Sequence, residues 1–64
     1  MDSINAKPGT YEVREAPTPH GGVRTVVFYF DAEDQPCSKS KAAKMQILEY
    51  DSSGVCIFSL ISEA

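Results

Sequence analysis

The sequence is poor in the residues from which catalytic and metal sites are built. It holds one histidine, two cysteines and no tryptophan in 64 residues. A general base needs an orienting partner and a nucleophile within reach, and none lies near His20 in the sequence. Zinc takes four ligands, which this set does not complete. Pockets of ligand size are also hard to build in so small a chain. We therefore expect no enzyme activity, no cofactor, no metal and no small-molecule ligand.

Long apolar runs are absent as well, and no stretch reaches the length of a transmembrane helix or of a signal peptide. Two cysteines do not indicate a secreted disulfide framework. We therefore expect a soluble protein in the cytoplasm that has no membrane partner. Cys56 lies inside an apolar run and is expected to be buried, whereas Cys37 follows Pro36 at a turn and is expected to be exposed.

Positive charge is scarce. Six Lys or Arg residues against nine Asp or Glu give a net charge of −3, whereas proteins that bind nucleic acid usually carry a basic surface. Nucleic acid is therefore an unfavoured partner. The alternative is a platform for single-stranded nucleic acid, in which aromatic side chains stack on bases beside cations. Its candidate contacts are Arg24, Tyr29, Lys39, Lys41 and Lys44.

A chain of this length forms at most one domain, and its 42% hydrophobic content is that of a globular protein. Residues 1–9 contain Pro8-Gly9 and little periodicity, which indicates a flexible N-terminal arm. Residues 10–64 are expected to form a single small β domain. A core of this size rarely supplies more than about 3–5 kcal/mol unless a disulfide, a metal or a partner subunit helps.

Alternation and turn residues predict four strands. Residues 10–15 alternate between apolar and charged side chains, which suits a sheet edge. A loop rich in proline and glycine follows, and residues 22–30 are rich in β-branched and aromatic side chains. Residues 44–50 and 55–61 flank Asp51-Ser52-Ser53-Gly54, which is typical of a type I turn closed by a left-handed glycine. The predicted fold class is all-β, a small four-stranded antiparallel meander.

The segment from Ser38 to Tyr50 leaves an alternative open. It contains good helix formers, and a helix over about 39–50 on a three-stranded sheet would give an α+β fold. Its apolar residues do not form one stripe on a helical projection, and its lysines precede its carboxylates, against the helix dipole. We therefore favour a loop or short helical turn over 37–43, followed by a strand.

Two stretches read alike at an offset of 20 residues: Phe30-Asp31-Ala32-Glu33-Asp34 and Tyr50-Asp51-Ser52-Ser53-Gly54. Each has an aromatic residue, an aspartate, two small or polar residues and a turn-closing residue. The pattern resembles the tyrosine-aspartate repeats of Rhs-type shell proteins, with Asp34 where that family has glycine. The resemblance implies two successive strand-turn units and no function.

Residues 26–30 and 55–61 are apolar on both faces of a strand, which is typical of strands covered on both sides. So short a chain has little material for two covers. We therefore expect a non-catalytic protein-interaction module that self-associates, as a homodimer, or docks on a protein partner through an apolar sheet face. The residues expected to divide between core and interface are Val27, Phe28, Tyr29, Ile57 and Phe58.

Overall fold

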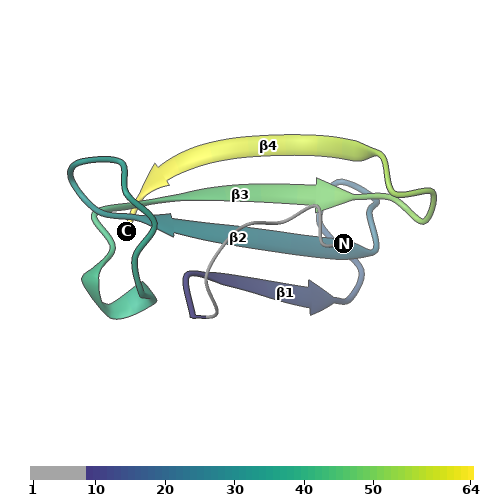
Figure 1. The fold of residues 1–64 in the computed structure, drawn as a ribbon. Helices are drawn as coiled ribbons and strands as arrows, with labels where there is room; N and C mark the ends of the chain where they lie inside the picture. Colours follow the sequence, from purple (N-terminus) through teal and green to yellow (C-terminus); the bar gives the residue numbers. More distant parts are fainter. Residues whose placement is uncertain (1–8) are drawn as a thin grey trace.

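A computed structural model describes residues 9–64, which form one antiparallel sheet with the strand order β1-β2-β3-β4 (Figure 1). The strands are β1 (Tyr11–Glu15), β2 (Arg24–Phe30), β3 (Lys44–Tyr50) and β4 (Cys56–Glu63), and a single 3₁₀ turn, η1, spans Lys39–Lys41. The predicted four-stranded meander is therefore confirmed. The predicted arm over residues 1–9 lies, apart from Gly9, outside the described residues.

The predicted strands differ from the observed ones mainly at their ends. β2 begins at Arg24, two residues later than expected, because Gly22 and Val23 belong to the loop before it. β4 continues to Glu63 since the main-chain amide of Ala64 still donates to the carbonyl of Ala43 at 3.1 Å. The alternative helix over 39–50 is wrong. Alternation across a pleated strand outweighs helix propensity there, and only η1 is helical.

The strand register sorts the side chains onto two faces, since directly paired residues share a face. One face, which we call the aromatic face, carries the paired residues Tyr11 and Phe28 and, further along, Phe30 and Tyr50. Its other apolar members are Val13, Val26, Leu48 and Ile61. The opposite face, which we call the clasped face, carries Val27, Tyr29, Met45, Ile47, Phe58 and Leu60.

The core within the described residues is small. The only apolar residues that are buried are Val26, 7% exposed, and Tyr29, 4% exposed, one on each face. Burial and the neighbouring carboxylate of Glu12 raise the pKa of Tyr29. Its neutral phenol donates a hydrogen bond of 2.8 Å to that carboxylate. The sheet is thus a single layer, and no second sheet or long helix of residues 9–64 packs on it.

The two turns that read alike in the sequence are alike in the structure. In each, the aspartate carboxylate accepts two main-chain amides at 2.8 and 3.0 Å, from residues 33 and 35 for Asp31 and from residues 53 and 55 for Asp51. The closing residue is left-handed in both, with φ of 66° at Asp34 and 85° at Gly54. The two strand-turn units implied by the sequence pattern therefore end in equivalent turns, and Asp34 adopts the conformation that glycine takes more easily.

Both expectations for the cysteines are wrong. Cys56 is exposed because β4 is an edge strand, and the register between β3 and β4 is irregular next to it. Cys37 is half-buried because its main-chain amide bonds to the carbonyl of Tyr29 at 3.1 Å, which holds it against β2. Within residues 9–64 both thiols are free.

Candidate functional site

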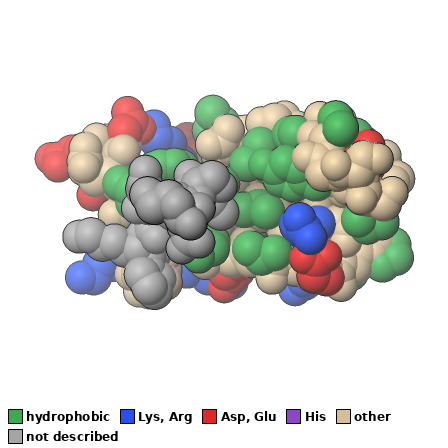
Figure 2. All heavy atoms as spheres, turned by 45° about the vertical axis from the view of Figure 1, so that its right-hand side comes forward, with side chains coloured by type: hydrophobic (Ala, Val, Ile, Leu, Met, Phe, Trp, Pro, Cys, Tyr) green, Lys and Arg blue, Asp and Glu red, His purple; other side chains and the backbone are tan. Residues whose placement is uncertain are grey.

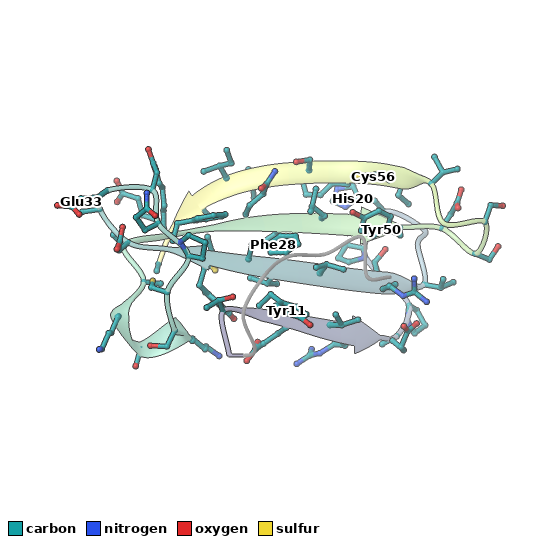
Figure 3. The ribbon with its side chains drawn as sticks, in the orientation of Figure 1. Tyr11, His20, Phe28, Glu33, Tyr50 and Cys56 are labelled. Carbon is teal, nitrogen blue, oxygen red and sulfur yellow. The ribbon has the colours of Figure 1, made fainter. Side chains whose placement is uncertain are left out.

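The aromatic face carries exposed and half-buried apolar side chains from all four strands. Tyr11 and Phe28 lie side by side on neighbouring strands, with ring centroids 6.0 Å apart (Figure 3). Beside them is a shallow hollow of about 320 Å³ lined by Val13, Val26, Tyr50 and their neighbours. Hydrophobic side chains gather there next to a pair of opposite charges (Figure 2). The surface suits packing against another protein better than holding a polar ligand.

Charges of both signs border the aromatic face. At one end Arg24 donates a 2.6 Å hydrogen bond to Glu15, its partner in the register. At the other end Lys44 forms an ion pair with Asp34 and lies opposite Glu63 in the register. The border is therefore balanced in charge. It would not repel a second copy of itself, and it offers no strongly charged patch for an oppositely charged partner.

The clasped face is partly covered by the loop over residues 16–22, which we call the clasp. The His20 ring stacks on Phe58 with ring centroids 3.9 Å apart, and its Nδ1 lies 2.9 Å from the Glu49 carboxylate. The main-chain amide of His20 donates to the same carboxylate at 3.3 Å. The clasp is closed on itself, since the Gly22 amide donates to the Thr18 hydroxyl at 2.7 Å. These contacts hold the clasp on the sheet.

Glu49 is the only buried charged residue among residues 9–64, at 4% exposed. A hydrogen bond from Thr18 lowers its pKa, burial acts in the opposite direction, and the hydrogen bonds and charge of His20 lower it further. The net effect is a pKa below the ordinary value of 4.5. The carboxylate is fully engaged by the clasp, so the pair of His20 and Glu49 is a structural contact and not a free acid–base pair.

Acid should therefore loosen the clasp. The folded-state pKa of Glu49 lies below its unfolded value, so Glu49 stabilises the fold above pH 4.5 and loses this contribution as the pH falls through the lower, folded value. We expect Glu49→Gln to flatten this part of the stability profile. Urea unfolding from about pH 3 to about pH 7, which spans the range in which carboxylates titrate, measures the pH dependence of the free energy of unfolding. Glu33→Gln, in an exposed turn, is the control; equal profiles for wild type and Glu49→Gln would contradict the assignment.

The predicted interface residues do not lie on one surface. Phe28 is on the aromatic face, while Val27, Tyr29 and Phe58 are on the clasped face. Tyr29 is buried and Phe58 lies under His20. Ile57 is exposed at the irregular start of β4. The sequence predicted that these residues divide between core and interface without assigning each one, because a local pattern does not say which strand is at the edge.

The candidate nucleic-acid contacts are also dispersed. Tyr29 is buried, and Arg24 and Lys44 are each paired with a carboxylate. Lys39 and Lys41 lie on η1, and every aromatic residue among residues 9–64 is buried or half-buried. The described residues therefore do not form a cationic surface with stacking platforms, which is the arrangement that single-strand binding needs.

The sequence did not predict several residues that hold the clasp on the sheet. Thr18 and Gly22 shape the clasp, and Glu49 receives it. The one sequence signal for this contact was Glu49 itself. It is a charged residue on β3 that the register places between Thr25 on β2 and Phe58 on β4. Residues 59–61 were predicted as part of a strand apolar on both faces but were not among the predicted interface residues.

No protein family model, no curated protein and no solved structure matches the chain. Among the described residues, no helix is long and apolar enough to cross a membrane.

Proposed function

We propose that this chain is a non-catalytic protein-interaction module that self-associates by packing its aromatic face against that of a second copy. The supporting observation is a single-layer sheet with apolar side chains on the face away from the clasp. Stable β architectures bury such a face against a second layer, commonly another sheet about 10 Å away. A second copy supplies this layer.

A second copy fits better than an unlike partner for two reasons. The border of the aromatic face is balanced in charge, with Arg24 and Glu15 at one end and Lys44 and Asp34 at the other. Twofold symmetric pairs are also the commonest oligomers, and each uses one patch twice. The two free cysteines within residues 9–64 agree with a reducing compartment, and we propose the cytoplasm.

A charge placed in this face should separate the copies. Val13 is 50% exposed on the aromatic face of β1, and Val13→Lys would bury an unpaired ammonium group in the interface. We expect this change to halve the mass of the assembly in sedimentation velocity. Val23→Lys is the matched control, since Val23 is 42% exposed and lies before β2, outside the aromatic face.

The control variant should keep the mass of the unmodified chain. The proposal is wrong if the unmodified chain sediments as one copy at every concentration, or if Val13→Lys leaves the mass unchanged while circular dichroism shows an intact sheet. A single copy would mean that another part of the chain, or a different protein, covers the aromatic face.

A further inference from the structure

The two edges of the sheet are built differently. β1 is short, Tyr11–Glu15, and three of its five residues are charged: Glu12, Arg14 and Glu15. Short and charged edges resist pairing with other strands. β4 runs over eight residues, Cys56–Glu63, contains no proline, and carries its one charge at Glu63. It has none of the features that protect β1, so it is the edge at which another strand can add.

The main-chain groups of β4 that point away from β3 follow from its hydrogen bonds. The amide of Ala64 donates to the carbonyl of Ala43 and therefore points toward β3. Main-chain groups alternate in direction along a strand, so residues 58, 60 and 62 also point toward β3. Ser59, Ile61 and Glu63 point outward. β4 is the last strand of the sheet, and no described main-chain hydrogen bond joins the outward amides of Ser59 and Ile61 to a neighbour.

The exposed apolar side chains of β4 lie on both faces of the sheet. Ile61 is 67% exposed on the aromatic face, and Leu60 is 47% exposed on the clasped face. Ile57, at the irregular start of the strand, is 39% exposed. A partner packed on the aromatic face alone would leave Leu60 in water, and one packed on the clasped face alone would leave Ile61 in water. A strand that adds at the edge contacts both, because its own side chains alternate in the same way.

We propose that β4 pairs antiparallel with β4 of a second copy, with the twofold axis at Leu60. This register pairs Ser59 with Ile61 of the other copy, through outward main-chain groups on both, and places the two Leu60 side chains together. It also separates the two Glu63 carboxylates, each of which lies opposite Ile57. The occupant is a second copy because this pairing matches every outward group of residues 59–61 with its counterpart and sets no like charges opposite each other.

The edge contact is separate from the contact between aromatic faces. Its twofold axis is perpendicular to the sheet, so the aromatic faces of the two copies continue side by side into one wider face. Packing two such sheets through their aromatic faces gives four copies with D2 symmetry, a common arrangement of homo-oligomers. Each interface can therefore be broken alone.

Proline at Ser59 tests the edge contact. Ser59→Pro removes an outward amide and leaves the hydrogen bonds to β3 in place, which is why proline is tolerated on edge strands. By symmetry it removes two hydrogen bonds between copies, and we expect edge association to weaken by about thirtyfold or more. Ser59→Ala keeps the amide and should keep the mass of the unmodified chain.

Sedimentation velocity then distinguishes the two interfaces. Ser59→Pro and Val13→Lys should each yield two copies, and the double variant one. The edge proposal is overturned if Ser59→Pro, with its sheet intact by circular dichroism, keeps the mass of the unmodified chain. Loss of association in Ser59→Ala as well as in Ser59→Pro would also overturn it, since the amide would then not be the cause.

Disulfide trapping tests the register without relying on proline. At the twofold axis the two Leu60 residues would form a pair without direct hydrogen bonds, with Cα atoms about 4.5 Å apart, within the range of disulfides. In a Cys37→Ser, Cys56→Ser background, Leu60→Cys should form a disulfide between copies when oxidised glutathione takes up the two electrons. Ser62→Cys is the control, because two such residues would lie about 14 Å apart. Equal trapping of the two variants, or none with Leu60→Cys, contradicts the register.

Discussion

Replacing Gly22 by alanine is expected to lower the free energy of unfolding by about 2–3 kcal/mol, the upper part of the range for a side chain added where there is no room. A Cβ atom at this position would lie 2.6 Å from the Tyr50 carbonyl oxygen and 2.8 Å from the Thr18 hydroxyl. The Tyr50 carbonyl is main chain and accepts the Val23 amide at 2.8 Å, so it cannot move without disturbing β2 and β3. For a chain of this size, the loss is most of the stability that a small core supplies.

The neighbouring glycine provides the contrast. Gly21→Ala adds the same methyl group where nothing lies within 4 Å, although φ there is +88°. Its cost should be limited to about 1–2 kcal/mol of left-handed backbone strain. Urea unfolding at one fixed protein concentration measures both variants, since association affects apparent stability. Loss of the ring-current shift between His20 and Phe58 in Gly22→Ala would locate the damage in the clasp. Equal stability of Gly22→Ala and wild type would contradict the packing described for it.

Replacing Asp51 by alanine is expected to cost about 2 kcal/mol. The carboxylate accepts the amides of residues 53 and 55, and each such hydrogen bond contributes about 1 kcal/mol net. This turn joins β3 directly to β4, so its loss frees the strand that forms the outer edge of the sheet. Thermal unfolding measured at one concentration tests the expectation.

Asp31 offers a comparison within the same molecule. It makes the equivalent hydrogen bonds, yet its turn is followed by only an isolated bridge between Phe30 and Pro36. We expect Asp31→Ala to destabilise the fold less than Asp51→Ala, because fewer strand contacts depend on the turn. Ser52→Ala, in the same turn as Asp51, should be nearly neutral. An equal effect of Ser52→Ala and Asp51→Ala would show that the carboxylate is not what holds the turn.

The strands and turns were predictable because their signals are local. Alternation located β1, β-branched and aromatic residues located β2, and the turn over 51–54 located β3 and β4. The aspartate of each turn accepts amides from the residues two and four positions later. The segment over 44–50 shows why alternation outweighed helix propensity. On a strand, Met45, Ile47 and Glu49 share the clasped face, where β2 and β4 flank them.

The clasp and the exposed edge were not predictable in this way. His20 and Glu49 are 29 residues apart, and their contact depends on the direction in which the loop over 16–22 leaves the sheet. The exposure of β4 depends on its place in the strand order, which its own residues do not report. An apolar run predicts burial, and under our proposal a second copy of the chain provides that burial for β4.

The central claim is that this sheet is completed by further copies of the chain, and sedimentation equilibrium of the full, unmodified protein tests it most directly. Across a wide range of concentrations, we predict a mass approaching four copies at the highest and falling through two copies to one on dilution. The mass of a single copy at every concentration would contradict the claim.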